Sequence, residues 1–399
     1  MSYIRNASIE LRTNPELQVL FLAFAGIWFV NDLYRQVIPL LFKQMGISPA
    51  VLGLAWSTVA VTEVVFSPIT GVIADKYDRM GIGSIACFAL TILFSLFYVA
   101  QQLTVIVVLM IGVGAGQLLL GNTATATVSE ELPDQISGIG WGLRDAFIYL
   151  GSGFGLATGG ILIASTDSTR IAFLAFCPIM LLLGILFARR GTFIFDLSFS
   201  IKDVHFVSLS NISANIREVS DQPILRKFLL VQALVSLGMG GTMFLLPVFA
   251  VDIGLGQSRY LIIFAVSNLV GIVMSLIGGL ASNVIPKKHL YVTNFIVEAA
   301  MLLMFAITTN IFFFGVAMSL FVIQTIFEPA VVGFFFDQFD DEEAARAWSI
   351  DGVVSKSASI IAPALGGVIY AIDPRITFAT GGLLTGIAAL VGATIPRGD

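Results

Sequence analysis

Charged side chains are scarce in this sequence of 399 residues. Lys, Arg, Asp and Glu make up 12% of it, against about 25% in an ordinary soluble protein, while apolar residues make up 57%. A soluble chain of this length needs a charged surface, which 21 basic and 26 acidic residues cannot supply. The scarcity excludes a soluble globular enzyme, a disordered chain and a fibre, and it indicates a polytopic membrane protein.

Cysteine and histidine are rarer still. Cys87 and Cys177 lie inside apolar runs, where a cysteine acts as a small apolar side chain. His205 and His289 stand alone, without the spacing of a metal site. We therefore expect no metal and no cofactor.

Several motifs are missing as well. The sequence has no large basic cluster and a net charge of −5, which argues against a nucleic-acid partner. It has no G-x-x-x-x-G-K-[S/T] loop, so ATP is not expected to supply energy. It also lacks H-E-x-x-H, G-x-S-x-G and paired-aspartate protease motifs, so a membrane-embedded enzyme is not expected.

Long apolar runs are abundant. A helix that crosses about 30 Å of hydrocarbon needs about 20 mostly apolar residues. The sequence predicts twelve such helices, at 17–43, 51–74, 81–100, 103–127, 138–164, 170–188, 226–250, 258–284, 289–309, 310–336, 346–371 and 375–395. One long polar stretch interrupts them, which predicts an N-terminal half of six helices (1–188), a linker (189–225) and a C-terminal half of six helices (226–399).

Basic residues fall unevenly between these runs. With the N-terminus inside, cytoplasmic segments hold fourteen of the 21 Lys and Arg, and outer loops hold four: Lys43, Arg170, Arg259 and Arg375. The positive-inside rule therefore predicts a multi-pass protein of the plasma (inner) membrane, with both termini and the linker in the cytoplasm.

The two halves repeat each other. Pro39 corresponds to Pro247 and Gly46 to Gly254, both at an offset of 208 residues. Six crossings return the chain to the same side, so the repeat is parallel. Transporters that move two halves about a site at the membrane midplane have this organisation.

The segment Gly71-Val-Ile-Ala-Asp75-Lys76-Tyr-Asp-Arg79 resembles the signature G-x-x-x-D-[R/K]-x-[G/D]-R-[R/K] of the major facilitator superfamily, except at its last position. The resemblance implies a bundle of twelve helices in two pseudo-symmetric halves. It also implies that Gly71, Asp75, Lys76 and Arg79 form a conformational latch against helix 11, with Gly71 letting two helices approach closely. The alternative is a polar loop that only sets topology.

A second resemblance lies in the fifth predicted helix. Five glycines follow the spacing of the antiporter motif of that family, although Leu156 replaces its proline. These glycines are Gly142, Gly151, Gly155, Gly159 and Gly160. The motif favours export over uptake, and general packing of small residues is the alternative.

Ionisable residues inside the spans are the main candidates for function, because each is costly in hydrocarbon. They are Asp32, Arg35, Glu63, Arg144, Asp145, Glu298, Glu328, Asp351 and Lys356. Six acids against three bases favour proton coupling.

Position divides these candidates. Asp32 and Arg35 are three residues apart and are expected to pair, either for proton coupling or only for structure. Glu63 and Glu328 are further candidates for proton or substrate binding, with hydrogen bonds between helices from a protonated carboxyl as the alternative, and Glu298 receives no role. The neutral candidates for the cavity are Tyr34, Gln117 and Gln324.

Four charges near the cytoplasmic ends of helices 5 and 11 form a separate group. They are Arg144, Asp145, Asp351 and Lys356. Arg144 and Asp351 are equivalent in the repeat and opposite in charge, which suggests a cytoplasmic gate pair. Separate charges at helix ends that face water are the alternative.

The family resemblance implies secondary active transport by alternating access, most simply proton-coupled efflux of small amphiphilic or drug-like molecules. One alternative is proton symport of a small organic anion held by Arg35, Arg144 or Lys356. Another is a membrane sensor or scaffold without transport. The expected partners are the lipid bilayer, a small-molecule substrate and protons, and the expected state is a monomer.

Overall fold

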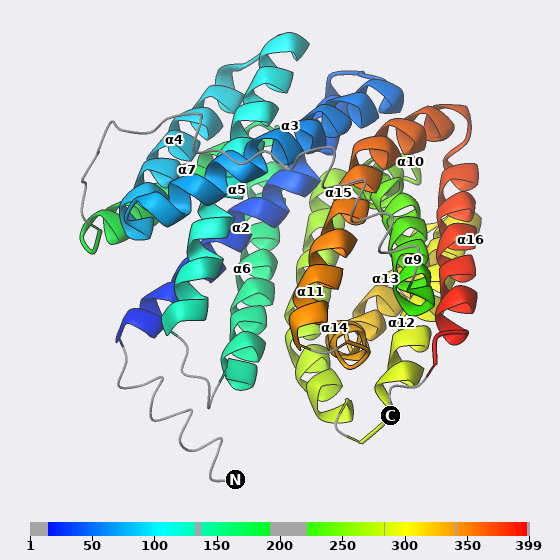
Figure 1. Ribbon diagram of the computed structural model, residues 1–399. Helices are drawn as coiled ribbons and strands as arrows, with labels where there is room; N and C mark the ends of the chain where they lie inside the picture. The colour runs from blue at the N-terminus through cyan, green and yellow to red at the C-terminus, as the bar shows by residue number, and fades with distance from the viewer. Residues whose placement is uncertain (1–14, 132–136, 192–221, 283, 340, 397–399) are drawn as a thin grey trace. The chain divides into compact units, whose positions relative to one another are not determined.

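The computed structural model describes residues 15–131, 137–191, 222–282, 284–339 and 341–396. Over these residues the chain is helical and has no strand (Figure 1). Twelve stretches are long and apolar enough to cross a membrane, which confirms the all-helical fold and the number of predicted spans.

The described residues divide into two compact units. The first contains 15–41, 61–191 and 261–272. The helices that lie wholly or mainly in it are α2 (Pro15–Gln44), α3 (Pro49–Lys76), α4 (Arg79–Val99), α5 (Leu103–Glu131), α6 (Ser137–Thr166) and α7 (Ile171–Ala188).

Aromatic side chains fill the core of the first unit. Phe94 and Phe176 meet edge to face with their ring centroids 4.6 Å apart, and Phe97 stacks on Phe173 at 4.8 Å. Tyr34 of α2 is 1% exposed and lies 5.9 Å from the Phe94 ring. Aromatic rings of α4, themselves packed on those of α7, contact Tyr34, and they thereby fix the part of α2 that also carries its polar residues.

The second unit contains 42–60, 222–260 and 273–396. The helices that lie wholly or mainly in it are α9 (Pro223–Gly240), η3 (Met243–Leu245), α10 (Leu246–Asp252), α11 (Gln257–Ala281), α12 (Lys287–Ile307), α13 (Ile311–Gln324), α14 (Glu328–Phe336), α15 (Asp341–Ile372) and α16 (Pro374–Ala393). Phe228, Tyr291 and Phe334 meet at the centre of a buried cluster, to which α9, α12 and α14 contribute.

The ends of the helices repeat at the predicted offset. Gly46 and Gly254 both adopt positive φ, at 69° and 85°, a conformation that glycine adopts without a steric penalty. The amide of each donates to the carbonyl three residues earlier, and the next amide donates to the carbonyl five residues earlier, which is the Schellman pattern. α4 and α12 likewise begin and end 208 residues apart. The duplication predicted from the sequence is therefore present in the fold.

Two spans of the second unit are broken where their counterparts are continuous. The seventh span passes from α9 through η3 to α10, with the break at Gly241 and Thr242. The tenth span stops at Gln324 and restarts as α14 at Glu328, followed by Pro329 (Figure 1). Proline lacks an N–H and cannot continue a helical ladder, which accounts for the second break.

The predicted boundary between the halves stays a prediction. Contacts group 42–60 with the second unit and 261–272 with the first, so the units do not follow the chain order alone. Most of the predicted linker, 192–221, lies outside the described residues.

Candidate functional site

Asp32 lies at the interface of α2 and α6. The hydroxyl of Ser152, which is fully buried, lies beside its carboxyl. Arg35 is exposed, and the described residues show no salt bridge between it and Asp32, although the Arg35 charge acts on the Asp32 carboxyl. The two residues therefore interact electrostatically without the direct contact that the sequence predicts. Three residues turn a helix by about 300°, which leaves the two side chains about 60° apart, and α6 covers only Asp32.

The first unit contains further polar groups within its spans. Tyr34 interacts electrostatically with both Glu63 and Arg35, which brings three of the predicted residues together. Asn31 Oδ1 and Gln117 Nε2 are buried atoms without a hydrogen-bond partner among the described residues. Such atoms are costly unless water or a ligand pairs with them, which makes α2 and α5 candidates for polar contact with a substrate.

The glycines of α6 bring its backbone against α2. A β-carbon at Gly151 would overlap the carbonyl oxygen of Ala25, and one at Gly155 would overlap the carbonyl oxygen of Phe29. A β-carbon at Gly159 would overlap the side chain of Leu33. The predicted stripe therefore packs α6 on α2 next to Asp32.

The remaining members of this motif give less information. Gly160 is buried. Gly142 lies outside the residues whose side-chain surroundings are described. Leu156, which stands where the family motif has proline, is fully buried, and α6 continues through it without a break.

The second unit repeats this contact. Gly366, the equivalent of Gly159, would overlap the carbonyl oxygen of Gly241 if it carried a β-carbon. Gly53 and Gly367 similarly bring the start of α3 against α15. Close backbone approach at the fifth and eleventh spans is thus a property of both units.

A polar cluster missed by sequence reasoning lies between α12 and α13. Glu298 is 6% exposed, and its Oε1 accepts hydrogen bonds from Asn294 Nδ2 at 3.1 Å and Gln324 Nε2 at 2.9 Å. Gln324 Nε2 also donates to Asn294 Oδ1 at 3.2 Å. Asn294 and Glu298 are four residues apart on one helix face, a spacing that the sequence shows but that alone does not identify the facing helix.

Glu328 lies next to this cluster. It interacts electrostatically with Glu298 across the break between α13 and α14. The predicted candidates Gln324 and Glu328 therefore meet around Glu298, the acid to which the sequence assigned no role.

The predicted gate residues belong to both units. Arg144 pairs with its neighbour Asp145, through Nη2 at 2.7 Å and Nε at 3.0 Å. Asp351 is 9% exposed and lies in the second unit, and Lys356 is exposed. A pair between Arg144 and Asp351 stays a prediction.

The predicted latch is described only in part. Asp78 accepts a hydrogen bond from the Gly81 amide at 2.8 Å and caps α4. This hydrogen bond stabilises the turn between Lys76 and Arg79. The Asp75 side chain lies outside the described residues. A β-carbon at Gly71 would meet no described atom within 4 Å, and the close approach expected there stays a prediction.

An ion pair that sequence reasoning also missed lies in the second unit. Lys43 Nζ bonds to Asp252 Oδ1, and the Tyr370 hydroxyl donates to Asp252 Oδ2 at 2.8 Å. The three residues come from the ends of α2 and α10 and from the last turn of α15. The side chains of Lys43 and Asp252 are 40% and 30% exposed, so solvent screens this pair.

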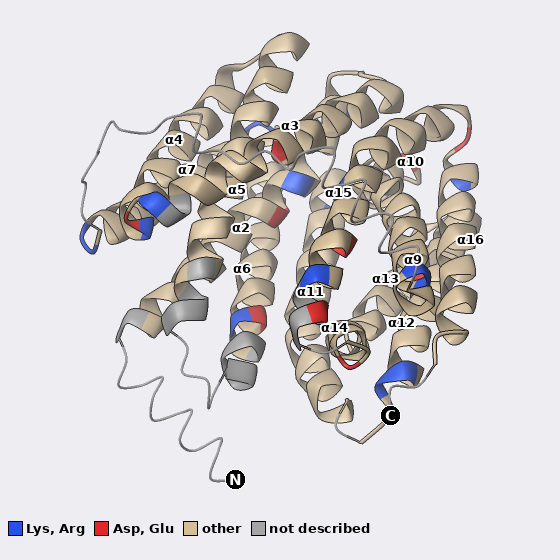
Figure 2. Cartoon of the chain, viewed as in Figure 1, with Lys and Arg blue, Asp and Glu red and all other residues tan. Residues whose placement is uncertain are grey.

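Figure 2 shows how sparse the charges are along the helices, which are mostly tan. Among the described residues, no group of three or more His, Cys, Asp or Glu could hold a metal ion.

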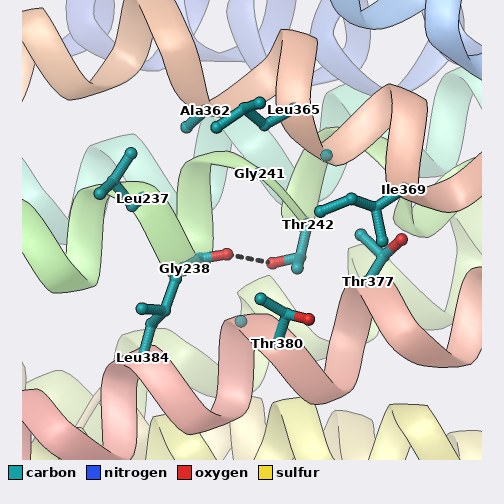
Figure 3. A pocket seen from close by; sticks show the side chains of 12 residues that line it. Leu237, Gly238, Gly241, Thr242, Ala362, Leu365, Ile369, Thr377, Thr380 and Leu384 are labelled. Carbon is teal, nitrogen blue, oxygen red and sulfur yellow. Dashed lines mark hydrogen bonds between the residues drawn. The ribbon is translucent and has the colours of Figure 1, made fainter.

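A small cavity of about 110 Å³ lies among α9, α15 and α16. Its lining is apolar apart from threonines, and the Thr242 hydroxyl donates to the Gly238 carbonyl at 2.8 Å (Figure 3). Drug-sized ligands occupy roughly 300–1,000 Å³, so this cavity is a packing gap at the break of the seventh span and no substrate site.

Known proteins with a similar fold are transporters. A bacterial homolog to the human lysosomal transporter Spinster, in an inward-facing and unoccupied conformation, has a TM-score of 0.73 at 15% identity, over 96% of this chain and 97% of that chain. A D-xylose-proton symporter has a TM-score of 0.70 at 13% identity, over 96% of this chain and 98% of that chain. At these identities the likeness shows the fold alone.

The relatives identified by sequence match a smaller part of this chain. Quinolone resistance protein NorA of Staphylococcus aureus (strain MRSA252) is 27% identical over 145 residues, and the matched stretch spans 36% of each chain. The family model for the Major Facilitator Superfamily matches residues 20–287 and 228–397, nearly the whole chain. The chain therefore belongs to the major facilitator superfamily of transporters, which are not enzymes.

Proposed function

We propose that this transporter exports small amphiphilic or drug-like molecules in exchange for protons, by alternating access. The observation that carries the proposal is the surroundings of the Asp32 carboxyl. Its carboxyl lies within a span and beside a buried hydroxyl, and it interacts with the Arg35 charge without a direct salt bridge among the described residues. A carboxyl placed in this way can exchange a proton for a cationic or polar group of a substrate.

The proposed cycle uses Asp32 as the coupling group. Substrate arriving from the cytoplasm displaces its proton, the two halves rock, and protons from outside reload the carboxyl as substrate leaves. Buried atoms without partners on α2 and α5, Asn31 Oδ1 and Gln117 Nε2, supply polar contacts to the substrate. The proton gradient is the energy source, and no cofactor takes part.

Two observations support export. The resemblance to the quinolone resistance protein NorA covers 145 residues, although at 27% identity. The glycine stripe of α6 makes the backbone contact with α2 that the spacing of an antiporter motif predicts. We place both termini in the cytoplasm, following the distribution of basic residues. We further propose that the protein acts as a monomer in the plasma membrane.

Two sets of charges are proposed to govern the conformational change. On the cytoplasmic side these are the latch at Asp75 and the pair Arg144–Asp351. On the outer side, Lys43, Asp252 and Tyr370 form a gate that opens when substrate is released outward. An exposed pair of this kind contributes at most about 1 kcal/mol, which suits a contact that breaks in every cycle.

Proton-coupled uptake of a small organic anion is the second candidate. Arg35 favours it, because this cation lies in a span, is exposed and has no ion-pair partner among the described residues. The likeness of the fold to a D-xylose-proton symporter is compatible with uptake but does not argue for it.

The direction of coupling can be tested in inside-out membrane vesicles, whose lumen corresponds to the outside. With an acidic lumen, export by antiport accumulates a fluorescent quinolone in the lumen, and a protonophore abolishes the accumulation. Vesicles without the protein are the control. If an acidic lumen instead drives substrate out of the vesicles, the protein is a symporter and the export proposal is wrong.

A further inference from the structure

The cluster around Glu298 has an unusual distribution of hydrogen bonds. Both amide donors, Asn294 Nδ2 and Gln324 Nε2, point at the same oxygen, Oε1. The other carboxyl oxygen, Oε2, is buried and has no hydrogen-bond partner among the described residues. Asn294 and Gln324 are themselves only 2% and 8% exposed, so the whole cluster lies out of solvent.

This distribution indicates what the site binds. A carboxylate shares its negative charge over both oxygens, and an unpaired charged oxygen inside a membrane span is costly. A proton on Oε2 removes that charge and leaves Oε1 as a carbonyl oxygen, which is the atom that accepts both amide hydrogens. A metal cation would instead need several oxygens directed at it, whereas here two amide N–H groups face the carboxyl.

Among the described residues, no basic residue lies beside the carboxyl. Of the helices that pack most closely on α12, α13 carries no charged residue, α14 carries Glu328, and α16 carries only Arg375. Arg375 is eleven residues before Gly386, the residue that packs on Ala299, so it lies about 16 Å along the helix from this level.

α9 meets α12 through Phe228 and Tyr291, directly after its bases Arg226 and Lys227, and α15 faces Tyr291 with Asp351. Tyr291 is seven residues before Glu298, about 10 Å along the helix.

The bases of α12 itself are equally remote. Lys287, Lys288 and His289 begin the helix, and His289, the nearest to Glu298, is nine residues away, about 13 Å. The remaining charge at the site is the acid Glu328, which repels the Glu298 carboxylate when both are ionised. A proton is therefore the available means of neutralising Glu298.

The break in the tenth span connects the site to motion. Gln324 is the last residue of α13 and Glu328 the first of α14, so both groups next to Glu298 flank the break. Gly278 of α11 lies against the carbonyl of Ile326 within the break, and any β-carbon there would overlap that oxygen. A shift of α14 against α13 changes the distances from Gln324 and Glu328 to Glu298, and with them the cost of ionising Glu298.

We propose that Glu298 is a proton-binding site of the second unit, with Asn294 and Gln324 as its hydrogen-bond donors and Glu328 as the acid that governs release of the proton. The site exchanges its proton when α13 and α14 move relative to each other at the break. Its role in coupling rests on the proposed function, but its binding of a proton does not.

Infrared difference spectroscopy of the purified full-length protein tests the site without transport. A protonated buried carboxyl gives a carbonyl band that shifts in D₂O. We expect this band in the wild-type protein during a pH titration and expect Glu298→Gln to remove it. Asp373→Asn is the matched control, because Asp373 is a partly exposed N-cap of α16, away from Glu298, and Asn also caps helices well.

A second variant leaves the acid in place. Gln324→Leu removes one donor to Oε1, so the carbonyl band of Glu298 should move to higher frequency without losing intensity. If the wild-type protein and Glu298→Gln give the same carboxyl bands, or if Na⁺ at constant pH removes the band, the site does not bind a proton in the way proposed.

Transport tests the coupling separately. In vesicles, Glu298→Gln should lower gradient-driven transport at least about tenfold while substrate counterflow continues. If gradient-driven transport is unchanged while the infrared band is lost, Glu298 binds a proton but does not couple it. If wild-type vesicles show no gradient-driven transport at all, the proposed function fails and the infrared result still decides the site.

Discussion

The first and second units contain equivalent spans with matching caps, yet they hold their buried acids differently. In the first unit α2 and α5 run unbroken, and Asp32 lies beside a single hydroxyl. In the second unit the equivalent spans are broken, and Glu298 lies in a cluster with two amides and Glu328 nearby. Duplication preserved the packing of the helices, while the polar positions diverged.

The preserved part is the close approach of two helices. Gly159 against the Leu33 side chain and Gly366 against the Gly241 carbonyl are contacts at equivalent positions in the two units. The diverged part is the break, because Pro329 occupies the position at which α5 has Gly121, 208 residues earlier. A continuous helix holds its side chains in one register, whereas a broken one allows two segments to move separately.

The sharpest test of this difference is Asp32→Asn. It removes the acid of the first unit and should abolish transport driven by a pH gradient, while counterflow exchange of substrate continues. Both are measured in vesicles with a fluorescent quinolone. Asp337→Asn is the control, since Asp337 is 46% exposed and pairs with Lys287 outside the cluster. Survival of gradient-driven transport in Asp32→Asn would show that the first unit does not carry the coupling proton.

The preserved contact is tested by Gly151→Ala and Gly366→Ala, one in each unit. Both introduce a β-carbon that overlaps a backbone oxygen, and overpacking of this kind costs about 1–3 kcal/mol. Thermal unfolding in detergent should show a lower midpoint for each variant.

The matched control for these variants is Gly121→Ala, because a β-carbon at Gly121 meets no described atom within 4 Å. A lower midpoint for only one of the two glycine variants would mean that only one unit depends on close approach of its helices.

Pro329→Ala makes the second unit more like the first. It restores an N–H at the start of α14, so the tenth span should become more continuous. We expect a thermal midpoint a few degrees higher and turnover lower by a factor of about 3–10. The control is Pro374→Ala in the first turn of α16, where proline is well tolerated. Unchanged turnover would mean that the break has no role in the cycle.

The smallest effect is expected for the pair Lys43–Asp252. Lys43→Ala should change the free energy of unfolding by less than about 1 kcal/mol, and high salt should reduce the difference. The swap Lys43→Asp with Asp252→Lys should recover the transport rate that either single change lowers. If the swap fails while both single variants fold, the pair does not act as a gate.

Much of the protein was predictable from local sequence. Hydropathy located the twelve spans because each needs only its own apolar residues to be stable in lipid. Repeated positions such as Gly46 and Gly254 revealed the duplication, because a turn that requires positive φ constrains the residue type directly. The family motifs predicted the fold, and the glycine spacing of α6 predicted that this helix packs closely on another helix.

The contacts of the buried acids were decided by tertiary structure. Arg35 is close to Asp32 in sequence and its charge acts on that carboxyl, but Arg35 is exposed while Asp32 lies beside Ser152 of α6, and no direct salt bridge joins them among the described residues. Glu298 received no role from its own helix, because its partner Gln324 is 26 residues away at the end of another. Spacing along one helix reports which side chains share a face, but it does not report which helix that face meets. The packing of the helices decides which neighbour a face contacts, and so it decides which polar groups surround each acid of this transporter.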